Sequence, residues 1–146
     1  MYKIGKGEMV SLDLDTKQKV LIAIYTEYQK DLPDMEKNIT THNLGFENDI
    51  FKIALNKLTN ENLINGVVFL NGGDNPVPAM ASVRYCQMTG QGIDYVEDKL
   101  DIKPNLSGAE KVAKVIEKSA GWGWDQIKEM CAKTIAEIVK SQMPSP

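Results

Sequence analysis

Two glycines and a tyrosine lie in the segment QMTGQGIDYVEDKL, residues 87–100, where a strand-like run gives way to a helical pattern. Glycine-rich turns can bind the diphosphate of a dinucleotide, but that site needs three glycines inside a parallel βαβ unit. Here Tyr95 takes the place of the third glycine, and the preceding strand belongs to a predicted hairpin. The segment therefore predicts a structural role: Thr89 caps a helix, Gly92 allows close packing, and Tyr95 and Val96 enter the core.

The remaining residues that could do chemistry are few and scattered. His42 is the single histidine, and it lies in a polar segment without a flanking acid or nucleophile, so a catalytic triad would depend on it alone. Cys86 and Cys131 lack the spacing of metal ligands and the density of a disulfide scaffold, which predicts two buried thiols. Pairs of acids could bind a cation or share a proton, but such pairs are common on solvated faces. They are Asp13 with Asp15, Asp31 with Asp34, and Glu97 with Asp98. We expect no enzymatic activity, no metal and no cofactor.

Length and composition fit a single domain with an appendage. The 146 residues include 42% hydrophobic residues, which is enough for a real core. No apolar run reaches the ~18 residues of a membrane helix, and residues 1–15 lack the apolar segment of a secretory signal. We therefore expect a cytoplasmic protein without a membrane partner. The net charge of −3 gives no overall positive field, so any DNA contact requires a local patch.

Hydrophobic periodicity predicts two helices in the first half of the chain. Asp15 and Gln18 can form a capping box for a helix that ends before Pro33. Its apolar positions are Val20, Leu21, Ile24, Tyr25 and Tyr28. Residues 1–14 have little periodicity and predict a loose arm or an edge strand, whereas residues 34–44 fit a short helix or a turn followed by a short strand. The clearest helix follows Gly45, and its apolar stripe consists of Ile50, Phe51, Ala54, Leu55 and Leu58.

A β-hairpin and further helices are predicted after residue 62. The runs LINGVVFL and MASVRYCQM flank NGGDNPVPA, whose turn-forming residues predict a long hairpin tip. The helix that follows stops before Pro104. Ser107 and Glu110 then form a capping box for another helix, GWGW interrupts it at residues 121–124, and a last amphipathic helix follows. These last two helices predict a C-terminal helical hairpin.

The order of these elements predicts an α+β fold that is mostly helical. It describes a winged helix-turn-helix, with a three-helix core and a β-hairpin wing, followed by the C-terminal helical hairpin. We expect an N-terminal arm at residues 1–14 and a winged-helix domain at residues 15–100. A helical extension at residues 101–146 then packs on the core or dimerises.

Residues 44–66, LGFENDIFKIALNKLTNENLING, resemble the YjcQ-like winged-helix proteins of bacteria and their phages. A hairpin and the spacing T-x-x-G-x-x-Y-V, which begins at Thr89, follow in the same order as in that family. The positions that match the family's core and turn pattern are Gly45, Phe51, Ala54, Leu58, Ile64 and Gly66. The resemblance covers residues 15–100 and implies a fold, not an activity.

DNA binding is the function that a winged helix suggests first, because the second helix of the motif commonly enters the major groove. The candidate contacts lie off the apolar stripe: Asn48, Lys52, Ile53, Asn56 and Lys57. The charge argues against this function. Between Phe46 and Ala79 two lysines face four acids, a net charge of −2, and Arg84 is the single arginine, although arginine to guanine is the commonest base-specific contact.

The C-terminal helices have a solvated side and an apolar side. Residues 101–146 carry seven lysines and six acids, alternating along the helix faces. The apolar side requires a cover, which is either the winged core or a second copy of the chain. The residues expected in this helix packing or dimer contact are Trp122, Trp124, Ile127, Ile135 and Ile138. The tryptophans either anchor the dimer or staple the helical corner to the core, and a homodimer is the expected assembly.

Two functions remain close. The first is a small DNA-binding transcription regulator that contacts double-stranded DNA through the five candidate residues between positions 48 and 57. The second is a winged helix that binds another protein through the same helix face and does not bind DNA. DNA binding stands slightly ahead because the fold so often serves it.

Overall fold

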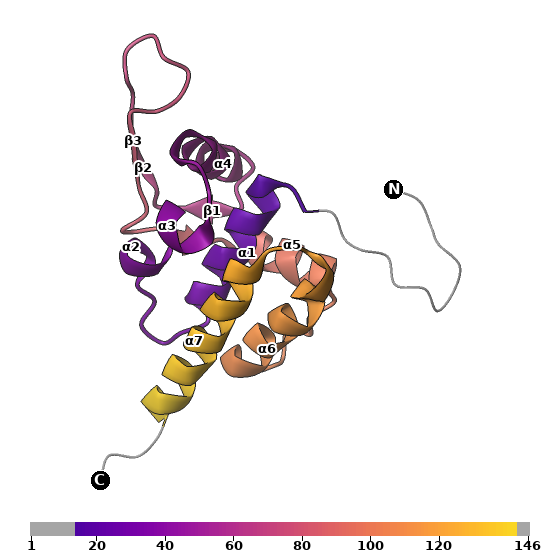
Figure 1. The fold of residues 1–146 in the computed structure, drawn as a ribbon. Coiled ribbons are helices and arrows are strands. Elements are labelled where there is room, and N and C mark those ends of the chain that lie inside the picture. Colours follow the sequence, from indigo (N-terminus) through magenta and orange to yellow (C-terminus); the bar gives the residue numbers. More distant parts are fainter. Residues whose placement is uncertain (1–13, 143–146) are drawn as a thin grey trace.

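The computed structural model describes residues 14–142, so the predicted N-terminal arm, apart from Leu14, lies outside the described residues. The chain is an α+β protein that is mostly helical (Figure 1). The helices are α1 (Thr16–Tyr28), α2 (Met35–Asn38), α3 (Thr41–Leu44), α4 (Asn48–Asn60), α5 (Gly90–Leu100), α6 (Gly108–Lys118) and α7 (Asp125–Gln142), with a 3-10 turn, η1, at Ser119–Gly121. The strands are β1 (Ile64–Asn65), β2 (Val68–Leu70), β3 (Met80–Ser82) and β4 (Gln87–Met88).

Helix α1 forms the centre of the core. The predicted capping box is present: the Asp15 carboxylate accepts a hydrogen bond from the Gln18 amide at 2.8 Å, and Gln18 Oε1 accepts one from the Asp15 amide at 3.0 Å. Every residue from Val20 to Glu27 is buried, so the helix is enclosed on all sides and not along one stripe. The cause is that α4 covers one side of α1, while α5, α6 and α7 also contact it.

Residues 34–44 form two short helices, α2 and α3, so the segment is helical but matches neither the single short helix nor the turn and short strand that the sequence left open. The Asp34 carboxylate accepts a hydrogen bond from the Lys37 amide at 3.1 Å, and the Thr40 hydroxyl accepts one from the Asn43 amide at 3.0 Å. Each cap satisfies a backbone donor at the start of a helical turn. These local bonds outweigh the strand preference of the β-branched residues around Ile39, which is buried in the core.

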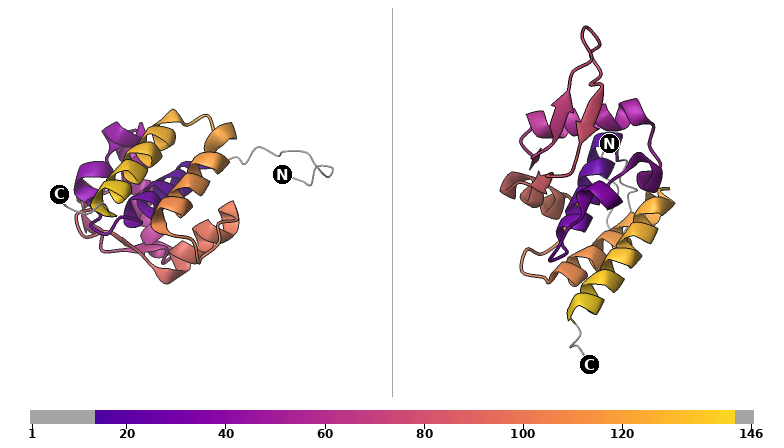
Figure 2. Two further views of the ribbon diagram at one scale, coloured as in Figure 1. Left: turned by 90° about the horizontal axis from the view of Figure 1, so that it is seen from below. Right: turned by 90° about the vertical axis from the view of Figure 1, so that its left-hand side faces the viewer.

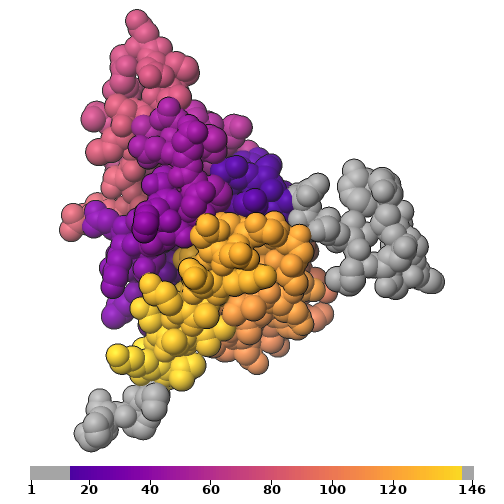
Figure 3. Space-filling view, viewed as in Figure 1, coloured from indigo at the N-terminus to yellow at the C-terminus, as the bar shows by residue number. Residues whose placement is uncertain are grey.

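The predicted β-hairpin is present, but it is bent into two short antiparallel ladders. Strand β1 pairs with β4, and β2 pairs with β3. Gly66 lies between the two ladders with a φ of 84°, and a Cβ at this position would lie 2.0 Å from the Tyr85 carbonyl oxygen, so only glycine fits the bend. The outer ladder and its tip project from the helical body in Figures 1 and 2, and they form a narrow ridge in Figure 3.

The roles predicted for Thr89 and Gly92 at the start of α5 are confirmed, and the roles predicted for Tyr95 and Val96 are confirmed only for Val96. The Thr89 hydroxyl accepts a hydrogen bond from the Gly92 amide at 2.9 Å, and a Cβ on Gly92 would lie 2.0 Å from the Leu63 carbonyl oxygen. Val96 is buried, but Tyr95 is 36% exposed, so its predicted core position is wrong. Successive residues of a helix are separated by about 100°, and this rotation places Tyr95 on the partly exposed side of α5.

Helices α6 and α7 lie side by side and pack against α1 (Figures 1 and 2). The capping box at Ser107 and Glu110 is present. At the corner between the helices, the indole Nε1 of Trp124 donates a hydrogen bond to the Leu44 carbonyl oxygen at 3.0 Å, and its ring lies 5.6 Å from that of Phe46. This contact fastens the corner to the loop between α3 and α4. None of the helices in residues 14–142 has the length and hydropathy needed to cross a membrane.

Candidate interaction surface

All five residues that the sequence proposed for DNA or protein contact belong to α4. Asn48 and Lys57 are exposed, whereas Lys52, Ile53 and Asn56 are partly buried. The buried face of the same helix consists of Phe51, Ala54, Leu55 and Leu58. The structure therefore brings the five candidates together on one helix, away from its core face.

Lys52 is engaged by the protein itself. Its Nζ donates a hydrogen bond to the Ala79 carbonyl oxygen at 3.3 Å and lies 3.6 Å from the Asp49 carboxylate. Only 13% of its side chain is exposed. Ala79 is the last residue before β3, so this bond fastens the hairpin to α4. One of the two candidate lysines on α4 is therefore engaged by a structural partner.

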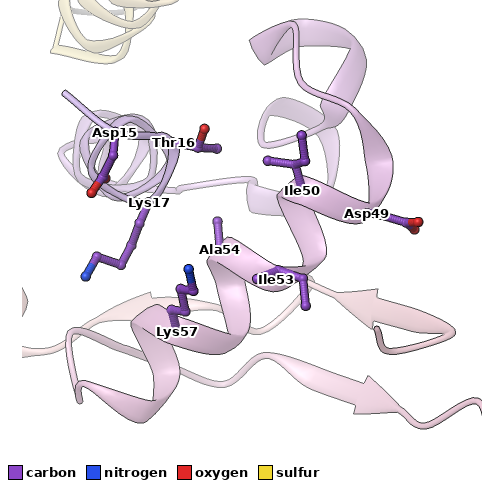
Figure 4. Close-up of a pocket in the computed structure, with 8 residues that line it drawn as sticks. All are labelled: Asp15, Thr16, Lys17, Asp49, Ile50, Ile53, Ala54 and Lys57. Carbon is purple, nitrogen blue, oxygen red and sulfur yellow. The ribbon is translucent and has the colours of Figure 1, made fainter. Parts of the chain in front are cut away.

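An open groove of about 450 Å³ lies between the start of α1 and helix α4 (Figure 4). Its lining residues are Asp15, Thr16, Lys17, Asp49, Ile50, Ile53, Ala54 and Lys57. Ile50 was predicted to be part of the buried stripe, but its side chain is 47% exposed. It lies in the first turn of α4, whereas Ala54, one turn further along the helix, is buried. We call these eight residues the α4 groove.

The charges of the α4 groove are balanced. Lys17 and Lys57 extend into the gap between the two helices (Figure 4), and Asp15 and Asp49 belong to the same lining. Lys17 Nζ lies 2.7 Å from the Glu61 carboxylate, and this hydrogen bond raises the pKa of Lys17 above its ordinary value. One of the two lysines is thus already paired. The groove combines an apolar floor with charged groups of both signs.

The residues that could have supported catalysis do not converge. His42 is exposed in the short helix α3. Cys86 and Cys131 are buried, as predicted, and burial raises the pKa of each thiol to about 12, which keeps both neutral and unreactive. Within residues 14–142, no group of three or more histidine, cysteine, aspartate or glutamate side chains is arranged to hold a metal ion.

The model of the YjcQ protein family matches residues 18–117. The chain belongs to the YjcQ protein family. The match extends into α6, farther than the residue 100 at which the resemblance was expected to end. Helix α6 contacts α1 and α5, so it is part of the same core. Comparison with curated proteins and with solved structures gave no match.

One residue of the family segment was misplaced by sequence reasoning. Glu97 was treated as half of an acidic pair on a solvated face, but it is only 5% exposed. Its Oε2 accepts a hydrogen bond from the Tyr25 hydroxyl at 2.8 Å and lies 2.7 Å from Lys111 Nζ. Burial, with this hydrogen bond, raises the pKa of Tyr25. The signal was present in the sequence, because Glu97 lies four residues after Ile93 and so shares its helix face.

A second buried carboxylate, Glu27, ties α1 to α2. Its Oε2 accepts hydrogen bonds from the Asp34 amide at 2.8 Å and from the Asn38 side chain at 3.0 Å, and Lys30 Nζ lies 3.0 Å away. Oε1 of Glu27 has no hydrogen-bond partner among the described residues. The Glu27 carboxylate therefore provides hydrogen-bond acceptors for donors in the turn between α1 and α2. The sequence pattern did not predict this structural role.

Helix α7 lies beyond the segment that the family model matches, and the chain itself covers its apolar side. Trp124, Ile127 and Ile138 are buried, and Trp122 and Ile135 are partly buried against the core. These are the five residues that the sequence assigned to helix packing or to a dimer contact. Helix packing inside one chain accounts for their burial.

Proposed function

We propose that this member of the YjcQ family is a winged-helix module that binds another protein through the α4 groove. The order of α1, the pair α2 and α3, helix α4 and then an antiparallel hairpin supports the winged-helix assignment. In such a module α4 is the presented helix and the β2–β3 hairpin is the wing. Because folds of this kind serve several functions, the assignment of a function rests on the surface of α4.

The α4 groove is the observation that carries this proposal. Its centre is apolar, with Ile50 47% exposed and Ile53 partly buried beside it. Charged side chains of both signs, from Asp49 to Lys57, surround this centre. An apolar centre with a polar rim is the typical arrangement of a protein-binding site, where apolar anchors of the partner enter and the rim selects it.

The cations that DNA binding requires are scarce on the same surface. Lys52 is held by Ala79 and Asp49, and Lys17 is paired with Glu61. The wing, residues 67–83, contains neither lysine nor arginine. Affinity for a duplex comes mainly from lysines and arginines that neutralise phosphates. The surface therefore favours a protein over DNA.

DNA binding remains the second candidate, supported by a specific observation on α4. Asn48 and Lys57 are exposed, and Asn56 is partly buried beside them, on the helix that would enter the major groove. Asparagine pairs well with adenine, and a lysine can contact phosphate. A dimer would double these contacts and compensate for a weak half-site.

The proposal is tested by affinity purification from an extract of cells that express this chain naturally. The proteins that bind to each immobilised variant are compared. Ile53→Asp places a charge in the centre of the α4 groove and should remove the specific partner. Leu32→Asp is the matched control, because Leu32 is 88% exposed and does not line the groove. Both variants should keep the circular dichroism spectrum of the parent. Identical sets of retained proteins for the two variants would contradict binding in the groove.

The two candidates are separated by fluorescence anisotropy of a labelled mixed-sequence duplex. If the groove binds protein alone, no association should occur even at low salt. Association that weakens steeply with salt, and that Lys57→Ala weakens further, would instead support the DNA-binding candidate. Lys118→Ala, on α6, is the control for a general loss of positive charge.

A further inference from the structure

Two asparagines of this chain are followed by glycine: Asn65 by Gly66 and Asn71 by Gly72. Asparagine is chemically labile, because its side chain can react with the backbone nitrogen of the next residue and lose its amide group as ammonia. Glycine permits this reaction best, since it has no side chain to shield its nitrogen or to restrict its backbone. All four residues are exposed. The backbone contacts of the two pairs therefore decide which asparagine reacts.

The backbone at Asn65 is held on both sides of its bond to Gly66. Asn65 pairs with Gln87 in the ladder of β1 and β4. Gly66 lies so close to the Tyr85 backbone that a Cβ would lie 2.0 Å from the Tyr85 carbonyl oxygen. The reaction requires the peptide plane between asparagine and glycine to rotate until the glycine nitrogen meets the side-chain Cγ, which an extended strand keeps apart. This rotation would break the pairing with Gln87 and move Gly66 out of its bend, so Asn65 is protected.

The peptide between Asn71 and Gly72 has no such restraint. It lies just beyond the end of β2, where the tip of the wing begins (Figure 1). Among the described residues, neither the Asn71 carbonyl nor the Gly72 amide makes a hydrogen bond, and the Asn71 side chain makes none either. The bonds of the tip lie on either side. The Leu70 carbonyl accepts one from the Ala79 amide at 2.8 Å, and the Gly72 carbonyl accepts one from the Asn75 amide at 3.4 Å. The plane can thus rotate without breaking a hydrogen bond of its own.

We propose that Asn71 is a site of spontaneous deamidation. The Gly72 nitrogen loses its proton to solvent and attacks Cγ of Asn71. A bond forms between this nitrogen and Cγ, the bond from Cγ to Nδ2 breaks, and ammonia leaves with a proton from water, so that a cyclic imide remains. Water then opens the imide at either carbonyl and produces aspartate or isoaspartate. The overall reaction consumes one water molecule, releases one ammonia molecule and needs no enzyme.

The reaction adds a negative charge to the tip of the wing. Among residues 67–83 the single charged residue is Asp74, so a second acid doubles the negative charge of the wing. Surface charge influences which partners approach a protein, and an added acid opposes a phosphate backbone in particular. The wing of an old molecule therefore differs from the wing of a new one, whichever partner the α4 groove binds.

The rates at the two asparagines can be compared within one molecule. The folded chain is incubated in heavy-oxygen water at mildly alkaline pH and digested with trypsin in ordinary water, so that only acid formed during the incubation carries the label. Trypsin cleaves after Lys57 and Arg84, which leaves both asparagines in one peptide, and tandem mass spectrometry distinguishes them. Asn71 should convert at least about tenfold faster than Asn65. This ratio corresponds to about 1.4 kcal/mol of activation free energy, the order of the one or two hydrogen bonds that Asn65 would lose.

The chain unfolded in guanidinium chloride is the control for the structural argument. Without its ladder and its bend, Asn65 should react at a rate similar to that of Asn71. The incubation lasts until half of both asparagines in the unfolded chain have reacted, and the folded chain is incubated for the same time. Equal rates at the two sites in the folded chain overturn the proposal. An Asn71 that stays intact in the folded chain overturns it as well.

Gly72→Ala tests the attacking nitrogen. A Cβ at Gly72 would lie 3.4 Å from the Ala79 Cβ, an ordinary contact, so the fold should be kept. The added methyl group shields the nitrogen and should slow the reaction at Asn71 several-fold. Gly90→Ala, whose Cβ would meet nothing within 4 Å, is the matched control and should leave the rate unchanged. A Gly72→Ala variant that reacts as fast as the parent contradicts attack by this nitrogen.

Anion-exchange chromatography gives a second measurement that needs no digestion. The parent should accumulate a more negative species with time, faster at alkaline than at mildly acid pH, because the attacking nitrogen must lose its proton. Asn71→Gln should not accumulate this species, since a longer side chain closes a larger ring and reacts far more slowly. An undiminished amount of the negative species in Asn71→Gln would place the reaction elsewhere in the chain and overturn the proposal.

Discussion

Glu97 shows how a single buried charge links three helices of this fold. The carboxylate on α5 accepts a hydrogen bond from the Tyr25 hydroxyl on α1 and pairs with Lys111 on α6. Glu97 is 5% exposed and Tyr25 is fully buried. A buried charge is tolerated only when partners replace its lost hydration. The stability of this junction therefore depends on each partner being present.

Tyr25→Phe should lower the free energy of unfolding by about 1–3 kcal/mol, because it removes one of the two groups that stabilise the buried carboxylate. Urea unfolding followed by circular dichroism gives this value. The matched control is Tyr85→Phe, since Tyr85 is 66% exposed and its hydroxyl makes no hydrogen bond among the described residues. Its change should stay within about 0.5 kcal/mol. Equal effects of the two variants would mean that the bond to Glu97 is not formed in solution.

The ion pair between Lys30 and Glu137 should make stability sensitive to acid. The hydrogen bond from Lys30 lowers the pKa of Glu137 below its ordinary value of 4.5. An acid with a lowered folded-state pKa stabilises the fold fully above its ordinary pKa, and this contribution is lost as the pH falls below it. Burial lowers the pKa of Lys30, but its bonds with Glu137 and Glu27 outweigh burial and keep the lysine charged throughout this range.

Glu137→Gln is the variant that measures this contribution. At pH 7 it should cost about 0.5 kcal/mol of unfolding free energy, because the Glu137 side chain is 48% exposed and solvent screens the pair. The difference from the parent should shrink as the pH falls below 4.5. Glu129→Gln, on the exposed face of α7, is the control. A difference that stays constant from pH 7 to about pH 3 would contradict the assignment to this carboxylate.

At the scale of the element, Gly92 sets how closely α5 approaches the hairpin. A Cβ at this position would lie 2.0 Å from the Leu63 carbonyl oxygen, a backbone atom that cannot move without shifting the end of α4. Gly92→Ala should therefore destabilise the fold by about 2 kcal/mol or more, although alanine favours a helix. Gly90→Ala in the same helix meets nothing within 4 Å and should be neutral or slightly stabilising. Thermal unfolding of the two variants compares them directly.

Local signals in the sequence were sufficient for most elements. The caps at Asp15, Thr89 and Ser107 place three helix starts correctly, because a cap depends on residues three positions apart. The bend of the hairpin at Gly66 could not be predicted in the same way. It depends on the close approach of the Tyr85 backbone, which is far along the chain. Elements were thus predicted where their causes are local, and missed where tertiary contacts decide.

The candidate surface was only partly predictable for the same reason. The sequence places five candidates on the outward side of one helix, and the structure agrees with that location. The sequence could not predict the hydrogen bond from Lys52 to the Ala79 carbonyl oxygen, since that bond joins α4 to a residue of the hairpin 27 positions further along the chain. Nor could periodicity predict the exposure of Ile50, because a helical stripe does not tell how far the neighbouring helix extends.

At the scale of the whole molecule, the C-terminal helices complete the cover of α1. Residues Val20 to Glu27 are buried all around, which α4 and the hairpin cannot achieve alone, and α6 and α7 supply part of the cover. Ile127 and Cys131 of α7 are themselves fully buried. Removal of both helices would expose the apolar side of α1 and leave Glu97 without Lys111. The total stability of a domain of this size is about 5–15 kcal/mol, so such a loss is not tolerated.

A chain that ends at residue 104 should therefore fail to fold as an independent domain, with aggregation or loss of cooperative urea unfolding as the result. A single substitution at the helical corner tests the same point more gently. Trp124→Ala should cost about 3–5 kcal/mol, because it removes a buried indole and its bond to Leu44, and Trp122→Ala should cost less because Trp122 is only partly buried. A truncated chain that unfolds cooperatively with the stability of the full chain would show that residues 15–104 are a domain on their own, and that α6 and α7 are an appendage to it.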